Sequence, residues 1–260
     1  NNAVYVEGTF EGEEPKSFTY EHPVSENEVR LVWHWQLQYK VDVVESDGGR
    51  VERSGGDWRL PGDTGTVRAT PADGYRFGCW TKGASSGHEL EPELTFSVGE
   101  GPTVLEANFQ KEVYVSKSGS DENAGTSWDD ALATVTAALE KYATPYVIVD
   151  DGVYDITSGL QLTNSITVCG RNAEGAVIRL KEQPVAGDKT RCVFFLDHVA
   201  ARVHHIAAAG IWNRSRDDQT AVQCGRGICL YNGLVENCVI SNNQTVSRTV
   251  NGGGAYVGSG

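Results

Sequence analysis

Apolar and polar residues alternate in short runs along most of the chain, which predicts β-strands. In YKVDVVE, Tyr39, Val41 and Val43 fall on one side of the predicted strand. Later runs such as YVIVDDGVYDI, GLQLTNSITVCG and GAVIRLK are also short, and Gly, Asn or Asp separates them. The pattern therefore predicts a mainly β protein with many turns.

One stretch has the spacing of a helix instead. Its apolar stripe consists of Trp128, Leu132, Val135, Leu139 and Tyr142. These positions predict an amphipathic helix over about 128–142. Ser127 and Asp130 have the spacing of a capping box, and Pro145 follows the predicted end. We expect this helix to cover the open end of a stack of strands, where unpaired edges would invite aggregation.

Turn residues divide the region before this helix into further strands. Asp47-Gly48-Gly49 predicts a hairpin, because these residues tolerate positive φ. A closing hairpin is expected over about 93–110. Tyr75, Phe77 and Trp80 are best interpreted as the core of a small β module.

The last third of the chain repeats itself loosely. Residues 227–230 align with 254–257 at an offset of 27, and residues 203–208 align with 235–240 at an offset of 32. Variable spacing of this kind is typical of solenoid coils with unequal loops, in which each coil buries its apolar face against its neighbours.

The segment 39–110 resembles the divergent internalin-B-type bacterial repeat. The residues that carry the resemblance are Gly48-Gly49, Gly65-Thr66-Val67, Ala69, Pro71, Gly74-Tyr75, Phe77, Trp80 and Ala107-Asn108-Phe109. Cys79 stands where a Gly commonly precedes the Trp. The resemblance implies a small β module of the kind found in cell-surface proteins, often as a spacer.

The segment 113–260 is similar to the N-terminal coils of right-handed parallel β-helix proteins of the pectin-lyase-like superfamily. The resemblance lies in Tyr114-Val115, Gly119-Ser120-Asp121, Gly125-Thr126-Ser127-Trp128, Asp151-Gly152-Val153-Tyr154, Ile166-Thr167-Val168 with Gly170, the Asn-rich run 237–243 and Gly252–Tyr256. Such proteins include lyases, hydrolases, adhesins and inert stalks, so the implied fold does not decide an activity.

Together these patterns predict small β modules followed by a right-handed parallel β-helix with one N-terminal capping helix. The expected domains are a partial β module at 1–37, the repeat module at 38–110 and β-helix coils at 111–260, with further coils expected beyond residue 260. Because Lys111 and Glu112 leave almost no linker, the module should pack against the coils.

The charge balance narrows the range of partners. The chain has 22 Lys and Arg against 35 Asp and Glu, for a net charge of -13. An acidic surface repels nucleic acid and anionic membranes, and a polyanionic ligand would need a local basic groove. No apolar run approaches the ~20 residues of a membrane span. The six Cys are expected to be buried small hydrophobes, with one disulfide among Cys192, Cys224 and Cys229 as the alternative.

The candidate binding residues lie in the longest polar insertion between coils. They are Trp212, Arg214, Arg216, Asp217 and Asp218. Loops that project from a rigid scaffold often carry binding sites, so this loop is a candidate contact for carbohydrate, with a merely solvated loop as the alternative. Trp33 and Trp35 are a second candidate sugar platform, or core residues of the first module.

No cofactor is expected, and calcium is the alternative through Asp121, Glu122 and Asp130. His204 and His205 are expected on opposite faces of a strand, where a metal would need a further ligand such as His198.

Two further polar pairs are expected to serve the coil turns. Asp150 and Asp151 would point to opposite faces if both lay in a strand, and Asp151 before Gly152 indicates a turn. Asn242 and Asn243 are expected in a stacked turn, where the amide side chains bond to the backbone and to each other between coils.

These observations favour a secreted or cell-surface bacterial protein. Its expected role is adhesion, or binding and display of a polysaccharide or a host or cell-surface glycan, and we expect a monomer. No catalytic motif is evident in the sequence. One alternative is a polysaccharide lyase or glycoside hydrolase whose site lies on coils beyond residue 260, and the other is a structural stalk.

Overall fold

The computed structural model describes residues 2–8, 16–22, 38–83, 85–173, 175–181, 192–210, 227–243 and 254–258. Strands account for 57% of the structure and helix for 4%, far below the ~30–35% helix of an average globular protein. The prediction of a mainly β protein is therefore confirmed. The chain divides into two compact units, residues 1–37 and 38–260. In the first unit, β1 (Asn2–Gly8) and β2 (Lys16–His22) pair antiparallel.

The second unit begins with two sheets that enclose one core, and we call residues 38–110 the module. One is a 3-stranded sheet with the order β4-β6-β9, and the other is the module's part of an 11-stranded sheet, with β5, β3, β10, β7 and β8. The strands are β3 (Tyr39–Glu45), β4 (Gly49–Arg53), β5 (Trp58–Arg59), β6 (Thr64–Pro71), β7 (Tyr75–Lys82), β8 (Ser85–Glu89), β9 (Glu93–Ser97) and β10 (Thr103–Val115).

Aromatic side chains form the core of the module, as the sequence predicts. Trp80 is 1% exposed, and its indole N–H donates to the Pro92 carbonyl at 3.3 Å. The ring of Phe77 lies 5.6 Å from that of Trp80 and 6.2 Å from that of Phe109. Tyr75 packs against the same cluster. These contacts give the aromatic residues of the motif a structural role.

The two predicted hairpins of the module are wrong. β3 pairs with β10 and β5 whereas β4 pairs with β6, so the turn at Gly48-Gly49 connects two sheets. β9 likewise pairs with β6 and not with β10. The aromatic core explains the change of sheet, because the rings of Tyr75 and Phe109 occupy the space that a Cβ at Gly48 or Gly49 would need. The absence of a side chain at these glycines therefore lets the aromatic rings pack against the turn, and the turn does not join two paired strands.

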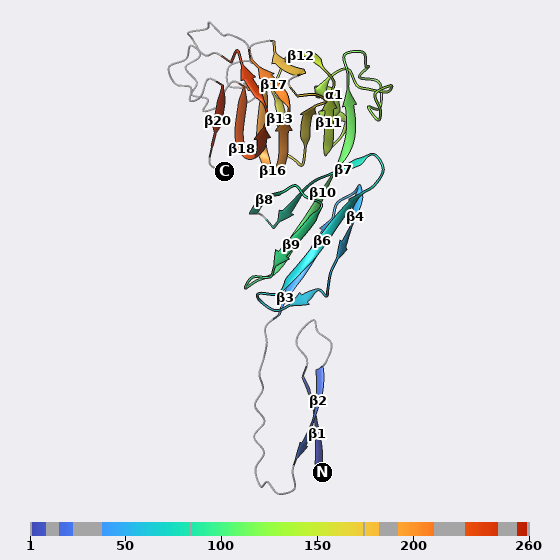
Figure 1. Cartoon of the computed structure of the whole chain (residues 1–260), viewed down its shortest axis with the longest axis vertical. Helices are drawn as coiled ribbons and strands as arrows, with labels where there is room; N and C mark the ends of the chain where they lie inside the picture. The colour runs from blue at the N-terminus through green and yellow to red at the C-terminus, as the bar shows by residue number, and fades with distance from the viewer. Residues whose placement is uncertain are drawn as a thin grey trace. The chain divides into compact units, whose positions relative to one another are not determined.

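β10 runs without a break into a second architecture, residues 111–258, which we call the stack (Figure 1). Its chain alternates between two parallel sheets. The first contains β10-β11-β14-β16-β18-β20, with β13 paired to β16, and the second contains β12-β15-β17-β19. The strands are β11 (Pro145–Val149), β12 (Gly152–Ile156), β13 (Leu160–Leu162), β14 (Thr167–Gly170), β15 (Ala176–Leu180), β16 (Phe194–His204), β17 (Ile206–Ala209), β18 (Ile228–Glu236), β19 (Val239–Ser241) and β20 (Ala255–Val257).

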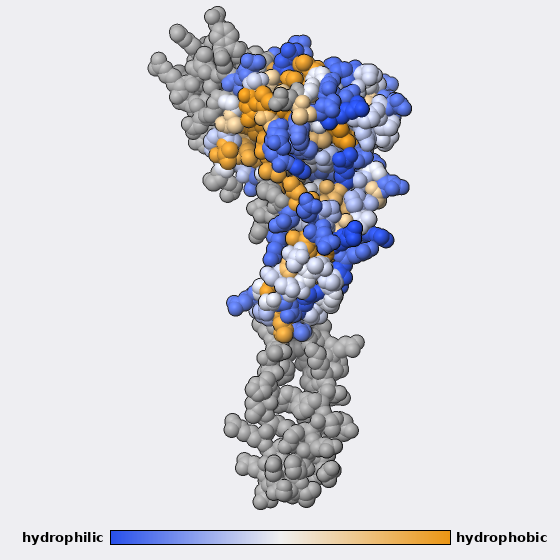
Figure 2. All heavy atoms as spheres, in the orientation of Figure 1, coloured by the Kyte–Doolittle hydropathy of each residue, from blue (hydrophilic) through white to orange (hydrophobic). Residues whose placement is uncertain are grey.

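The strand registers confirm both internal alignments read from the sequence. Ile228 pairs with Ala255 at the offset of 27, and Val203 pairs with Val235 at the offset of 32. The core side of the first sheet carries one column of in-register valines, formed by Val113, Val147, Val168, Val203 and Val235. β-Branched side chains pack well on a pleated surface, so this column aligns the successive strands. On the face shown in Figure 2, hydrophobic residues gather over these strands.

The helix is shorter than predicted. α1 spans Val135–Lys141, and its N-cap is Thr134, whose hydroxyl accepts the Ala137 N–H. The Ser127 hydroxyl does accept the Asp130 N–H at 3.2 Å, but the Asp130 carboxylate accepts from Thr126 and not from Ser127. Residues 127–130 therefore form a turn, and the apolar stripe divides between this loop and the helix.

The edge of β10 that no strand of the stack pairs with is covered by the loop before α1, and not by α1 itself. Tyr114 N–H donates to the Gly125 carbonyl at 2.8 Å, and Leu132 N–H donates to the Tyr114 carbonyl at 2.9 Å. Leu132 also forms a parallel bridge with Val115. α1 contributes apolar cover through Val135 and Ala138, both 0% exposed. The cap thus has two parts, a loop that satisfies the strand edge and a helix that closes the core.

Candidate functional site

The module and the stack are joined by buried polar contacts as well as by β10. Gln110, midway along β10, is 0% exposed and donates from Nε2 to the Ser165 hydroxyl at 3.2 Å. Gly78 leaves room for this amide, since a Cβ there would lie 2.9 Å from Gln110 Cδ. The guanidinium of Arg76 lies over the Tyr146 ring at 4.9 Å. These contacts hold the two parts in one arrangement, as the short linker predicts.

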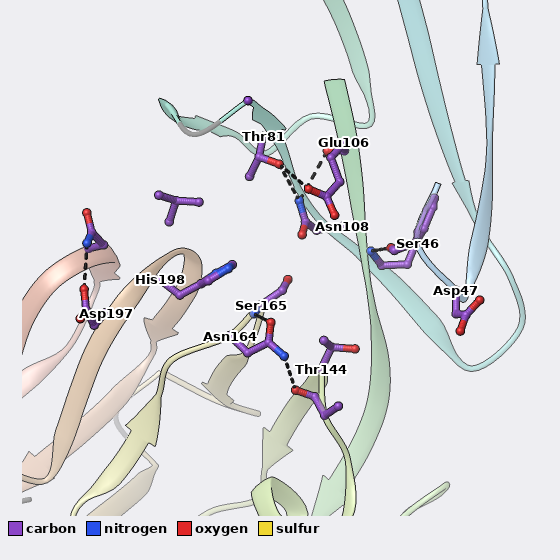
Figure 3. Close-up of a pocket in the computed structure, with 15 residues that line it drawn as sticks. Ser46, Asp47, Thr81, Glu106, Asn108, Thr144, Asn164, Ser165, Asp197 and His198 are labelled. Atoms are coloured by element: carbon purple, nitrogen blue, oxygen red, sulfur yellow. Dashed lines mark hydrogen bonds between the residues drawn. The ribbon is translucent and has the colours of Figure 1, made fainter. Parts of the chain in front are cut away.

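A polar cleft of about 660 Å³ lies between the module and the stack (Figure 3). The module contributes Ser46, Asp47, Thr81, Gly83, Glu106, Asn108 and Phe109, and the stack contributes Ala143, Thr144, Asn164, Ser165, Asp197, His198, Val199 and Asn232. Its volume falls within the range of ~300–1,000 Å³ that is usual for small-molecule sites. The cleft is therefore the candidate functional site.

Hydrogen bonds fix the polar side chains on the module wall. The Asn108 amide donates to the Thr81 hydroxyl at 3.4 Å, and that hydroxyl donates to the Glu106 carboxylate at 3.4 Å. The Ser46 hydroxyl donates to the Ala107 carbonyl and accepts the Phe109 N–H. Both sets of hydrogen bonds end on residues of β10, so this strand positions the polar side chains of the module wall.

The wall on the stack side is formed by residues within β16 and β18 and by the segments that precede β11 and β14. The Asn164 amide donates to the Ala143 carbonyl and accepts the Ser165 N–H at 2.9 Å. The Asn232 amide donates to Asp197 at 2.8 Å. His198 Nδ1 accepts the Ala200 N–H at 3.1 Å, which fixes the orientation of the imidazole. Burial lowers the pKa of His198, although Glu106 and Asp197 raise it in part.

The candidate sugar-binding residues from the sequence lie outside the described residues. The loop with Trp212, Arg214, Arg216, Asp217 and Asp218 lies outside the described residues, as do Trp33 and Trp35. Its role in carbohydrate binding stays a prediction. Among the sequence candidates, His198 does line the cleft, but as a cleft residue and not as a partner of a histidine pair.

The expectation that His204 and His205 face opposite sides is wrong. His205 has a left-handed backbone with φ of 55°, which breaks the alternation of the strand. The two Nδ1 atoms consequently lie 2.7 Å apart, and His204 Nε2 lies 3.2 Å from the Tyr146 hydroxyl. Burial, together with the positive charges of Arg202, His205 and Arg76, lowers the pKa of His204 to about 4.

This shift predicts that stability falls in mild acid. An unfolded histidine has a pKa near ~6.5, so protons favour the unfolded chain as pH drops from ~6.5 to about 4, where folded His204 also titrates. The loss should approach about 3 kcal/mol and be absent above ~pH 7. Urea unfolding at several pH values measures it, and His204→Gln should flatten the dependence in this range. An equal pH dependence in that variant would contradict the assignment.

The acidic residues of the cap loop hold the loop together. Asp121 accepts the N–H groups of Ala133 and Thr134, each at 2.9 Å, and the Thr134 hydroxyl at 3.0 Å. Asp130 accepts the Thr126 hydroxyl at 3.1 Å. Within the described ranges, no group of three or more His, Cys, Asp or Glu is arranged to hold a metal ion. These bonds give both carboxylates a structural role, and calcium binding stays a hypothesis.

The paired polar residues in the turns bond between coils. Asp151 lies in a turn, as predicted, and accepts the Asn172 amide at 3.0 Å. Asp150 also lies beyond the end of β11 and pairs with Arg171 at 3.1 Å. The Asn243 amide donates to the Ala208 carbonyl at 3.0 Å, which confirms the expected bond from this turn to the neighbouring coil.

The described cysteines are largely buried, as expected. Burial raises the pKa of Cys79 to about 12 and of Cys169 to about 11, so both remain protonated at neutral pH. Cys192 and Cys229 lie buried in one cluster, whereas Cys224 lies outside the described residues. The alternative of a disulfide among these three therefore stays a hypothesis.

Sequence reasoning missed most of the cleft. Glu106, Ser165 and Asp197 carry no local motif, and they meet only because β10 belongs to both the module and the stack. The one residue that the sequence could have indicated is Asn108, because it is a polar residue between two apolar ones in the Ala107-Asn108-Phe109 motif.

Comparison with known families bears on the module alone. Residues 39–113 match the family model of the divergent InlB B-repeat domain. This family is a bacterial surface-type domain, which agrees with the first resemblance in the sequence. No curated protein and no solved structure matches the chain. The module is therefore similar to this repeat domain, and the match does not extend over the stack.

In the part of the chain that the structure describes, no helix is long and apolar enough to cross a bilayer.

Proposed function

We propose that the chain is part of a secreted or cell-surface bacterial protein that binds a glycan in the cleft between the module and the stack. The carrying observation is the cleft itself, with hydroxyl, amide, imidazole and carboxylate groups on two rigid walls. Sugars are recognised by dense sets of donors and acceptors of this kind. The bacterial surface character of the B-repeat family supports the location.

We further propose that the stack is a right-handed parallel β-helix. Its strands alternate between two parallel sheets, and connections between parallel strands of one sheet are nearly always right-handed. Such a scaffold would hold one wall of the cleft rigid, because each coil packs on the next.

Blocking the cleft tests the proposed function. Ala143 is exposed and lines the cleft, so Ala143→Trp should fill part of it and weaken glycan binding at least about tenfold. Ala124→Trp places the same side chain at an exposed site outside the lining and should leave binding unchanged. Glycan-array screening followed by calorimetry of both variants is the measurement. Glycan binding that Ala143→Trp does not weaken, or an absence of binding throughout, would contradict the proposal.

A further inference from the structure

The charged side chains that line the cleft are all acidic. Its charged lining residues are the carboxylates of Asp47, Glu106 and Asp197, and no Lys or Arg occurs among the described residues that line it. Their field adds to that of a chain with a net charge of -13. A uronate, sulfate or phosphate group would enter this cleft without a cationic partner, which is unfavourable.

His198 presents a hydrogen-bond donor from the stack. Because Nδ1 accepts the Ala200 N–H, the proton of the neutral imidazole must be on Nε2. Burial lowers the pKa of this side chain, which keeps it neutral at pH 7. In Figure 3 the ring extends into the space between the two walls. His198 therefore offers an N–H donor, and not an acceptor, to a bound molecule.

Glu106 presents the matching acceptor from the module. Its Oε2 receives the Thr81 hydroxyl at 3.4 Å, and Asn108 donates to that hydroxyl in turn. A carboxylate has about four lone-pair sites, so this one bond leaves it able to accept others. Figure 3 shows the Glu106 carboxylate on the wall opposite His198, turned toward the cleft.

We propose that the cleft selects an uncharged glycan whose hydroxyl groups accept from His198 Nε2–H and donate to the Glu106 carboxylate. A sugar hydroxyl is both donor and acceptor, so neighbouring hydroxyls satisfy both walls at once. A cationic amino sugar would satisfy the carboxylates but would set an ammonium group against the N–H of His198. This inference rests on the proposed function and names the ligand class of the same site.

Calorimetry with three probe classes tests the selectivity. The probes are neutral gluco- and manno-oligosaccharides, oligogalacturonates and chitosan oligosaccharides of equal length, titrated into the full chain at pH 7. A neutral probe should bind at least about tenfold more tightly than either charged class. Tighter binding of a charged class, blocked by Ala143→Trp, would overturn the selectivity and leave the proposed function standing. Binding of no class, or binding that Ala143→Trp does not block, would overturn the proposed function itself.

Substitutions separate the two roles. Glu106→Gln should weaken the neutral probe about tenfold, since hydrogen bonds to charged groups are the stronger ones, and should narrow the preference over oligogalacturonate. His198→Leu should weaken the neutral probe similarly, whereas His198→Gln, which keeps an N–H donor, should recover part of the affinity. Glu140→Gln is the control, because it also removes one negative charge but at an exposed position on α1. It should change neither the affinity for the neutral probe nor the preference over oligogalacturonate. Unchanged affinity in both Glu106→Gln and His198→Leu would overturn the assignment, provided both variants unfold at the temperature of the parent chain.

Discussion

Replacing Leu132 by alanine is expected to lower the free energy of unfolding of residues 38–260 by about 4 kcal/mol. Leu132 is 0% exposed and packs in the core of the stack, so the change removes buried carbons and leaves a cavity. Its neighbours cannot easily collapse into the space, because backbone hydrogen bonds to Tyr114 and Ser116 hold the loop on the edge of β10. Urea unfolding of the full chain measures the effect.

Leu139→Ala is the matched control, because it makes the same change on α1. Leu139 is only partly buried against the same core, so the expected loss is about 1 kcal/mol. This pair distinguishes the two parts of the cap. If Leu139→Ala destabilised the chain as much as Leu132→Ala, the helix and not the loop would be the main cover of the stack.

Gly170→Ala is expected to lower the free energy of unfolding by about 3 kcal/mol. A Cβ at Gly170 would overlap the carbonyl oxygen of His205, which belongs to the next turn of the stack, and would lie 2.9 Å from the Asn172 carbonyl oxygen. Both obstacles are backbone atoms, so relief requires that neighbouring turns move apart. The variant thus tests how closely successive strands of the stack approach each other.

Gly99→Ala provides the comparison for this change. Gly99 is exposed in the loop between β9 and β10, and a Cβ there meets nothing within 4 Å. Its expected effect stays within about 0.5 kcal/mol. Equal melting temperatures for the two alanine variants would show that the turns at Gly170 and His205 are not packed as described.

The sequence alone predicted which residues repeat from coil to coil and which aromatic residues form the core of the module. The offsets of 27 and 32 reappear as strand registers because each coil must bury the same apolar positions against its neighbour. Trp80 and Phe77 could be assigned to the core because large aromatic side chains dominate the cores of small modules. The predicted stripe from Trp128 to Tyr142 does contribute apolar residues to the core, although the helix spans only Val135–Lys141.

The sequence alone could not predict which strands pair in the module or which residues meet in the cleft. The Gly48-Gly49 turn obeys the rules for a hairpin, but the rings of Tyr75 and Phe109, distant in sequence, make it a connection between sheets. The cleft depends on β10 continuing from the module into the stack, which brings Glu106 opposite His198. A left-handed residue such as His205 also reverses a face without any sequence signal.

The most direct test of a glycan site at the junction is a crystal structure of the full chain with the neutral oligosaccharide that binds most tightly. We expect the sugar between the module and the stack, with hydroxyl groups within hydrogen-bond distance of the Glu106 carboxylate and of His198 Nε2. An oligosaccharide bound elsewhere on the chain, with the cleft filled by water alone, would contradict the account.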